Sequence, residues 1–397
     1  MKFTLKNATL VSMMAIAASV SFTACDDDDD DNNNNSTWTA QDLAISAAGI
    51  LDNYVDNVVV ATYKDLKDDS KSLLDAVEAL ASDPNADNMT KVDKYWKAAR
   101  QDWEYSEAFL FGAATDYAID PHIDTWPFNQ TNFDNLMSKY NPSENESDAE
   151  VIDESVANTQ SLTGFHALEY VIYANGETKD PSSLSANELY FCKAVAADLY
   201  LNAIKLYGSW AGESALSDDE AAVAEEAEVE FTYNYGDEFK NAGNSGSRWK
   251  TPTLALVQII DGCNDIIGEV RDAKIGSAHS GEDVTYIESP FSHNSITDFY
   301  DNIISCAHAL YGTNEITNVT SVDNLTASAK SLMTYAALTH SDKTGVVATK
   351  LANALVKIAA MKRPFVTYYA DESAKDAMDA LEELEDALDD LKSALEE

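Results

Sequence analysis

The sequence predicts an all-α protein, and two observations lead to that prediction. The chain has only 15 glycines and 8 prolines among 397 residues, so residues that break helices are scarce. Hydrophobic residues recur every three or four positions through long segments such as YWKAARQDWEYSEAFLFG, TLALVQIIDGCNDIIGEV and KLANALVKIAAMK. No convincing run of alternating hydrophobic and polar residues predicts a strand.

The N-terminal segment has the features of an export signal. Lys2 and Lys6 precede an apolar stretch over residues 8–20, and small residues follow. The segment ends in FTAC, which resembles the lipobox of bacterial lipoproteins, with phenylalanine where leucine is usual. We therefore expect residues 1–24 to be a lipoprotein signal peptide and Cys25 to be the lipidated first residue of the mature protein.

An acidic, asparagine-rich tether is expected over residues 25–37. The six aspartates at 26–31 and the four asparagines at 32–35 cannot bury apolar surface, so this stretch stays solvated. It resembles the acidic export tag of some surface lipoproteins, and a plain spacer fits its composition equally well. The expected location is the cell envelope, as an outer-membrane lipoprotein on the periplasmic or the outer face.

The charge balance excludes nucleic acid as a partner. Lys plus Arg total 26 against 69 Asp plus Glu, a formal net charge of -43. Such a chain repels phosphate backbones and anionic lipid headgroups, and it attracts cations. Three cysteines lie beyond Cys25 in apolar helical contexts. Their spacing resembles no metal knuckle, so we expect Cys192, Cys263 and Cys306 to be buried thiols.

Helix signals divide the chain into two helical halves. Residues 187–210 can form one long central helix, and the segment 212–246, rich in Glu, Ala, Asn and Gly, predicts a transition. We place the first half at 38–234 and the second at 235–397. Further boundary signals are a cap at Thr251, a first-turn proline at Pro252 and the start of the last helix after Pro364.

Two polar stripes cross helices that are otherwise apolar. In GFHALEYVIY, His166, Glu169 and Tyr170 share one helical face. In AARQDWEYSEAFLFG the same spacing places four side chains on one face, namely Arg100, Trp103, Glu104 and Glu107. Polar groups buried without partners are costly, so each stripe faces either solvent or a site. An HxxE pair alone favours a structural role, but two stripes in one half point to a site.

These stripes could converge into a cage of carboxylates and an imidazole, as helical bundles do when they bind metals. One imidazole with several carboxylates suits iron, zinc or manganese. The following loop DYAIDPHIDTWPFN adds Asp124 and Trp126, and the segment ESPFSHNS adds Ser292, although capping of the next helix by Ser295 or Asn294 explains that segment as well. The expected direct ligands of a divalent or trivalent metal are His166, Glu169, Glu104 and Asp124. The expected surrounding or ligand-binding residues are Glu107, Arg100, Trp103, Trp126, Tyr170 and Ser292.

These segments resemble the imelysin family of exported bacterial proteins. The stretches YWKAARQDWEYSEAFLFG, DPHIDTWP, GFHALEYVIY and ESPFSHNSITDFYDNIISCAHALYG occur in that family's order, and Gly164, His166 and Glu169 match its GxHxxE signature. The resemblance implies two related helical-bundle halves packed together, with a site near their junction. It also implies a role in the acquisition of iron or another metal, and we expect uptake-system proteins as partners in such a role.

Members of the family have also been called metallopeptidases, which is a different function. A zinc peptidase helix usually carries HExxH or HxxEH, whereas Tyr170 follows Glu169 here. Three functions therefore stay open: a metal-binding protein of metal acquisition, a metal-dependent peptidase, and a structural or adhesion lipoprotein in which these residues form only a buried polar network.

We expect Cys25→Ser to release the protein from membranes or to block its processing, because the variant lacks the thiol that would carry the lipid. Fractionation of cells that express the full chain, with a gel that separates precursor from mature protein, measures both effects. Unchanged membrane attachment and unchanged size would contradict lipidation at Cys25.

Overall fold

The computed structural model describes residues 47–139 and 162–397, and these residues confirm the all-α prediction. Within them, the strands β1 (Tyr173–Ala174) and β2 (Glu177–Thr178) form one short antiparallel pair, which the hydrophobic pattern did not predict. The signal peptide, Cys25 and the tether lie outside the described residues. No helix in the described part of the chain combines the length and the apolar character needed to cross a membrane.

The helices of the N-terminal part are α2 (Ala47–Tyr54), α3 (Val60–Ser82), α4 (Ala86–Glu104), α5 (Ala113–Asp116), α6 (Asp120–Ile123), α7 (Gln130–Lys139), α9 (Gly164–Ile172), α10 (Ala186–Ala211), α11 (Asp218–Glu226) and α12 (Tyr235–Lys240). Those of the C-terminal part are α13 (Pro252–Gly268), α14 (Ser277–Ser280), α15 (Ser295–Tyr311), α16 (Leu332–Ala337), α17 (Ser341–Ala359), α18 (Phe365–Tyr368) and α19 (Glu372–Glu396). Two π-helical segments, Val55–Val59 and Glu269–Gly276, continue α2 and α13 without a break.

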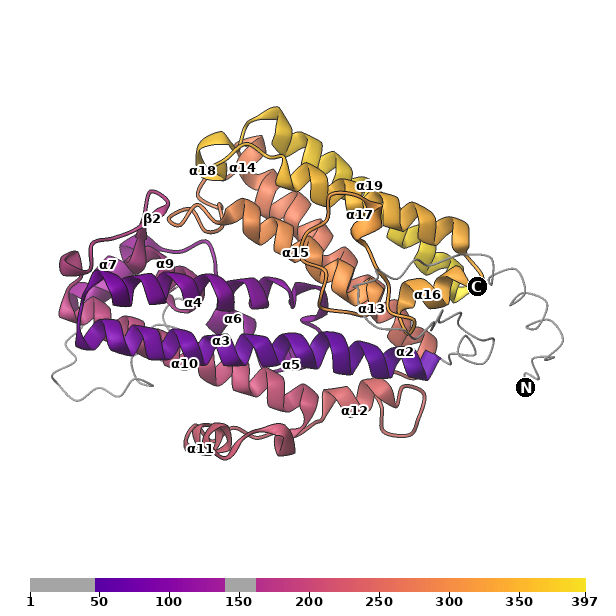
Figure 1. The fold of residues 1–397 in the computed structure, drawn as a ribbon, viewed down its shortest axis with the longest axis horizontal. Helices are drawn as coiled ribbons and strands as arrows, with labels where there is room; N and C mark the ends of the chain where they lie inside the picture. Colours follow the sequence, from indigo (N-terminus) through magenta and orange to yellow (C-terminus); the bar gives the residue numbers. More distant parts are fainter. Residues whose placement is uncertain (1–46, 140–161) are drawn as a thin grey trace, which may run out of the picture.

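The first group of helices is built on α3, α4 and α10, which pack along their lengths (Figure 1). Capping side chains fix where two of them begin. Asn85 accepts a hydrogen bond from the backbone of Asn88 at the start of α4, and Ser185 forms a capping box with Glu188 at the start of α10. The short helix α9 packs against α10 and α4, so its residues point into the interior of this group.

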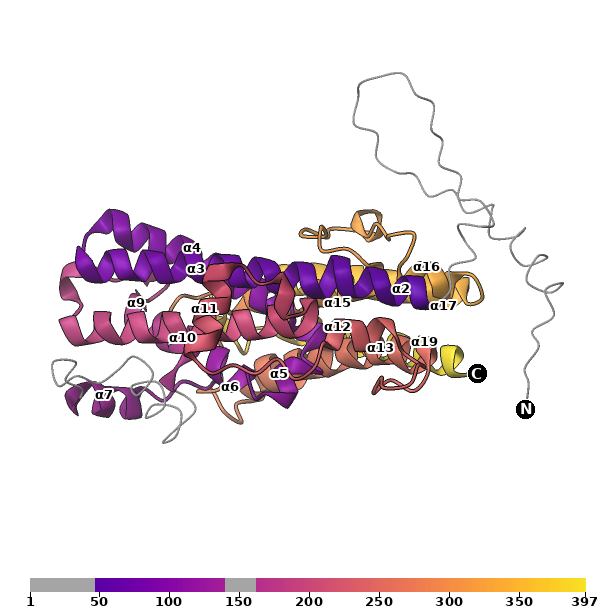
Figure 2. The ribbon, with the colours of Figure 1, turned by 90° about the horizontal axis from the view of Figure 1, so that it is seen from below.

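The second group contains α13, α15, α17 and α19, and its long helices cross those of the first group at an oblique angle in Figure 1 and lie along them in the view of Figure 2. The side chain of Thr251 accepts a hydrogen bond from Leu254 N, and Pro252 occupies the first turn of α13, as the sequence predicted. The final helix α19 buries a leucine stripe against α13 and α17. The expectation for the thiols is also confirmed: Cys192, Cys263 and Cys306 are buried and free.

The two groups share one continuous hydrophobic core. Helix α15 packs against α4, and α13 packs against the 3₁₀ turn Glu107–Phe109 that follows α4. The helix α12, which begins at the boundary expected from the sequence, contacts α10 and α2 of the first group. A division of the chain at residue 235 therefore stays a prediction, and the contacts of α12 associate it with the N-terminal helices.

The approach of α13 to the Glu107–Phe109 turn depends on Gly262. A Cβ atom at this position would lie 2.1 Å from the carbonyl oxygen of Ala108. We expect Gly262→Ala to lower the free energy of unfolding by about 1–3 kcal/mol, because the turn must move away from α13. Gly345→Ala, in a helix with no atom within 4 Å of the new methyl group, is the control, and it should stabilise the protein by about 1 kcal/mol. Urea unfolding of both variants measures the difference, and equal effects would show that the contact at Gly262 is not tight.

Candidate metal centre

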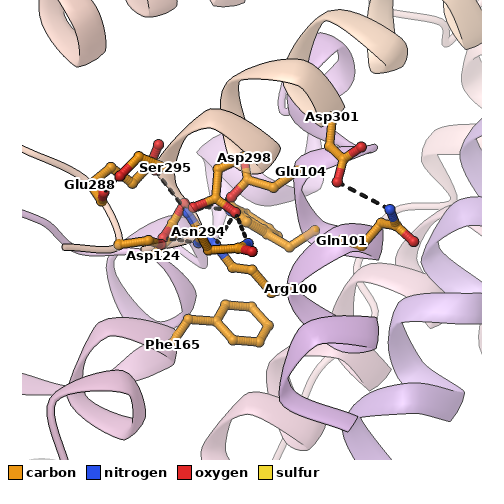
Figure 3. A network of polar contacts seen from close by, with 12 residues as sticks. Arg100, Gln101, Glu104, Asp124, Phe165, Glu288, Asn294, Ser295, Asp298 and Asp301 are labelled. Atoms are coloured by element: carbon orange, nitrogen blue, oxygen red, sulfur yellow. Dashed lines mark hydrogen bonds and ion pairs between the residues drawn. The ribbon is translucent and has the colours of Figure 1, made fainter. Parts of the chain in front are cut away.

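A completely buried arginine is at the centre of the candidate site. The guanidinium of Arg100, on α4, forms ion pairs with Glu104, Asp124 and Glu288, the last at 2.8 Å, and its Nε lies 3.6 Å from Asp298 Oδ1 (Figure 3). Burial by itself favours the neutral form, but the four carboxylates outweigh it and raise the pKa of Arg100 further above its ordinary value. Arg100 therefore carries a fixed positive charge in the interior.

The predicted histidine lies beside this arginine. Nε2 of His166 is 3.0 Å from Asp124 Oδ1, and its Nδ1 is 3.3 Å from Glu169 Oε2. Burial lowers the pKa of His166, but the two carboxylates raise it more, to about 9. Burial likewise works against the charged form of Asp124, yet Arg100 and His166 hold its pKa well below the usual range. Trp103 Nε1 donates to Asp124 Oδ2 at 2.8 Å, so both carboxylate oxygens are fixed.

Gly164 explains how His166 comes so close to Asp124. Its φ is +75°, and a Cβ atom there would lie 2.2 Å from the carbonyl oxygen of Ile123, the residue before Asp124. Any side chain would therefore push α9 away from the loop that carries the aspartate. Trp96 on α4 also holds α9, because its Nε1 donates to the carbonyl oxygen of Phe165 at 3.1 Å.

The second residue of the HxxE pair binds the second half of the chain. Oε1 of Glu169 accepts hydrogen bonds from Phe291 N at 2.9 Å, Ser292 N at 2.7 Å and Ser292 Oγ at 2.7 Å. Its other oxygen faces His166. In this arrangement Glu169 orients the imidazole and anchors the 291–292 loop. Its assignment as a direct metal ligand stays a prediction, and Ser292 reaches the site through this glutamate.

The second half contributes charged residues that the sequence analysis missed. The ammonium of Lys274 lies 3.0 Å from Glu288 Oε1 and 3.9 Å from Glu104 Oε2. On α15, Asp298 faces Arg100, and Asn302 donates to Glu104. Asp298 and Asn302 are four residues apart on α15, so the spacing argument that selected His166 could have found them. Glu288 and Lys274 lie in segments without such a pattern.

The structure adds detail on three predicted residues. Helix α4 ends at Glu104, so Glu107 comes from the following 3₁₀ turn rather than from the same helical face, although it is buried. The hydroxyl of Tyr170 donates to Asp134 at 3.2 Å, so Tyr170 contacts the α7 region and not the arginine. The ring of Trp126 contacts that of Tyr286 in a tilted arrangement, and the ammonium of Lys274 lies 5.9 Å from the centre of the Trp126 ring.

The helix cap expected in ESPFSHNS also differs. Asn294 occupies the residue before α15, but its side chain does not cap the helix and instead donates to Asp298 Oδ1 at 2.6 Å. Ser295 Oγ donates to the carbonyl oxygen of Glu288 at 2.6 Å, which fixes the residue that faces Arg100. The polar side chains of this segment therefore organise the site.

We use the name Arg100 cluster for nine buried residues: Arg100, Glu104, Glu107, Asp124, His166, Glu169, Lys274, Glu288 and Asp298. Two groups within it bring three ligand atoms within 4.8 Å of one another, and they share Asp124. One group is Asp124, His166 and Glu288, and the other is Glu104, Glu107 and Asp124.

The first group fits a metal ion. Glu288 Oε2 has no hydrogen-bond partner in the described part of the chain, although the residue is completely buried. His166 Nε2 contacts Asp124 but forms no well-aligned hydrogen bond. A nitrogen and two carboxylates, each from a different segment, form a donor set that iron and zinc accept. The group also contains the histidine and the aspartate that the sequence selected.

We expect Arg100→Met to lower the free energy of unfolding at pH 7 by roughly 3–5 kcal/mol, because several carboxylates lose their buried counter-ion. Those carboxylates then have pKa values above those of the unfolded chain, and they take up protons as the pH falls from 7 to 5. The loss of stability relative to wild type should therefore become smaller over this range. Lys97→Met on the same helix, at a half-exposed side chain, should change stability by less than about 0.5 kcal/mol. Denaturant unfolding at both pH values measures the loss of stability, and a loss that is independent of pH would contradict this prediction.

Comparisons with known proteins agree with this architecture. The family model described as Imelysin matches residues 59–395. The protein named iron-regulated protein A from Synechococcus elongatus is 27% identical over 262 residues. The matched region covers 66% of this chain and 64% of that protein, so this chain spans less than two thirds of its length. A crystal structure described as a candidate iron-regulated protein A precursor from Parabacteroides distasonis has a TM-score of 0.73 and 24% identity, and it covers 87% of this chain and 94% of its own.

A second crystal structure, of an imelysin-like protein from Psychrobacter arcticum, has a TM-score of 0.59 and 15% identity, with 86% of this chain and 94% of that chain covered. At such identities the two structures show a common fold and no more. The family model, in contrast, spans most of the chain, including every residue of the Arg100 cluster. The protein belongs to the imelysin family.

Proposed function

We propose that this protein binds a metal ion, iron first among the candidates, in the Arg100 cluster, and that it serves metal acquisition at the cell envelope. The observation that carries the proposal is the convergence of His166, Asp124 and Glu288 in a buried, acid-rich site. A buried cluster in which carboxylates outnumber cations must either take up protons or bind a cation. Binding of a metal satisfies both the excess charge and the oxygen of Glu288 that has no partner.

The choice of iron rests on chemistry and on similarity. Carboxylate oxygens and one imidazole nitrogen are suitable ligands for iron, manganese and zinc, and no thiolate lies in either ligand group of the described residues. The similarity to a protein named iron-regulated protein A favours iron among these ions. Zinc is the second candidate because the same donor set suits it.

Burial favours a cargo site over a catalytic one. His166 is 1% exposed and Glu288 is 0% exposed, so a peptide could not reach an ion held between them without a rearrangement. A metallopeptidase also needs a position open to water and a carboxylate base beside it. The oxygen of Glu169 that would have to act as this base faces His166, and the other accepts three hydrogen bonds. We therefore prefer metal binding to peptide hydrolysis.

Anchoring at the membrane belongs to the same proposal. A lipid on Cys25 and the acidic tether would hold the helical domain near the membrane, where uptake-system proteins could receive the ion. The net charge of -43 would raise the cation concentration around the domain. A purely structural network, the remaining alternative, would leave the protein without metal affinity.

We expect wild-type protein, purified without chelator, to bind Fe(II) under anaerobic conditions and Zn(II), and His166→Ala and Glu288→Gln to bind each ion at least about tenfold more weakly. His340→Ala, at a histidine before α17, is the matched control and should bind as wild type does. Calorimetric titration gives the affinities, and circular dichroism confirms that helix content is unchanged. Equal affinity in all variants, or no binding, would favour the structural network. Zinc-dependent peptide cleavage that is lost in Glu169→Gln would favour the peptidase.

Protons should compete with the metal. The pKa of His166 without metal is about 9, so the imidazole is protonated at pH 7 and must release a proton to bind an ion. We expect affinity to rise between pH 7 and 9 and to fall below pH 7. Titration in two buffers of different ionisation enthalpy measures the released proton, and an affinity independent of pH would contradict a role for this imidazole.

A further inference from the structure

We propose that the Arg100 cluster binds two metal ions and not one, with Asp124 as the shared carboxylate and Glu104 and Glu107 as the additional ligands of the second ion. The inference rests on the proposed function and deepens it, because it concerns the capacity of the same site. The first ion would lie at His166, Asp124 and Glu288, and the second at the neighbouring carboxylate group.

The geometry of the second ligand group is set by three segments. Glu104 is the last residue of α4, Glu107 begins the 3₁₀ turn after it, and Asp124 follows α6. Their oxygens lie within 4.8 Å of one another. Their exposed fractions are 0%, 8% and 5%. The turn that carries Glu107 is held by α13 and by Ser305 Oγ, which accepts a hydrogen bond from Ala108 N at 3.1 Å.

Glu107 is the independent observation that points to a ligand. It is more than nine-tenths buried, yet its carboxylate forms no hydrogen bond and no ion pair with any residue of the described ranges 47–139 and 162–397. Glu104, in contrast, pairs with Arg100 and accepts a hydrogen bond from Asn302. Burial raises the pKa of Glu107 even though Lys274 counteracts it, so the charged form of this carboxylate is costly. A cation beside it would remove that cost.

The charge balance of the cluster matches two divalent ions. Its nine residues include six carboxylates and two permanently cationic side chains, Arg100 and Lys274, so four negative charges are left when the imidazole is neutral. One divalent ion would neutralise half of this excess. Two would neutralise all of it, without any carboxylate having to retain a proton in the interior.

Asp124 is able to bridge. Its Oδ1 accepts a hydrogen bond from Arg100 and faces His166, and its Oδ2 accepts one hydrogen bond, from Trp103. Each carboxylate oxygen has two lone pairs, so Oδ2 keeps one for a further partner. Metal ions that share a carboxylate lie about 3.5–4 Å apart in two-metal sites, which is compatible with ligand groups as compact as these.

Lys274 makes the second position weaker than the first. Its ammonium contacts Glu288 of the first ligand group and lies 3.9 Å from Glu104 of the second ligand group. It therefore repels a second cation until its flexible side chain moves. The second group also lacks an imidazole. We therefore expect sequential binding, with a second ion of the hard, oxygen-preferring kind, and Mn(II) is the appropriate probe.

We expect Mn(II) to bind to the full mature chain with a stoichiometry of two, and Glu107→Gln to reduce it to one. Elemental analysis after dialysis gives the stoichiometry, and electron paramagnetic resonance distinguishes a coupled pair of Mn(II) ions from a single ion. The control is Glu269→Gln. Glu269 lies 3.9 Å from Lys274, as Glu104 does, but its side chain is 46% exposed and it belongs to neither ligand group, so this variant should keep both ions.

The outcomes separate this inference from the proposed function. One ion per chain in wild type, lost in His166→Ala and kept in Glu107→Gln, would overturn the second position while metal binding at His166 stands. One ion lost in Glu107→Gln and kept in His166→Ala would support the carboxylate position and overturn the proposed one. No bound ion would overturn both. The melting temperature of metal-free Glu107→Gln should be no lower than that of wild type, because the substitution removes a carboxylate whose burial outweighs its attraction to Lys274. A lower melting temperature would mean that Glu107 has a structural role and would overturn its assignment as a ligand.

Discussion

The ion pairs of Arg100 are the constraint on which the junction of the two helical groups depends. Its guanidinium contacts Asp124 from the first group and Glu288 and Asp298 from the second. A buried ion pair adds little net stability compared with apolar packing, but removal of one partner is very unfavourable. The arginine therefore fixes the register of α15 and the Glu288 loop against α4. The apolar core supplies most of the stability, and the arginine specifies how the groups meet.

A neighbouring acidic region shows what a purely structural solution looks like in the same protein. Asp102 and Asp301 lie close to the Arg100 cluster, and burial raises their pKa values to about 9 and about 8. Because no arginine or histidine of the described residues forms an ion pair with them, these carboxyls keep their protons near neutral pH. The Arg100 cluster differs because cations hold Asp124 in its charged form. A charged carboxylate such as Asp124 can bind a metal ion directly, whereas a protonated carboxyl must first release its proton.

The sequence predicted the helices and the first-half part of the site, for identifiable physical reasons. Helical periodicity places residues three and four apart on one face, so His166, Glu169 and Arg100 could be selected from their spacing alone. Glu288 was missed because its position depends on a loop folded back by Ser295, and loops have no period. Glu104 and Glu107 do not share the helical face that the spacing predicted, because α4 ends at Glu104. Local patterns therefore identify residues on regular elements, and tertiary contacts bring in the rest.

Loading of so deeply buried a site requires motion, and the contacts indicate which motion costs least. Separation of the two helical groups would expose their shared hydrophobic core. Release of the 291–292 loop would break the hydrogen bonds to Glu169 and one from Gly176 N to the carbonyl oxygen of Phe291, 2.8 Å long, and would separate the ring of Phe291 from that of Tyr170. Local opening of that kind is the cheaper event. The HxxE glutamate would then act as a latch, because the residue that orients His166 also holds this loop closed.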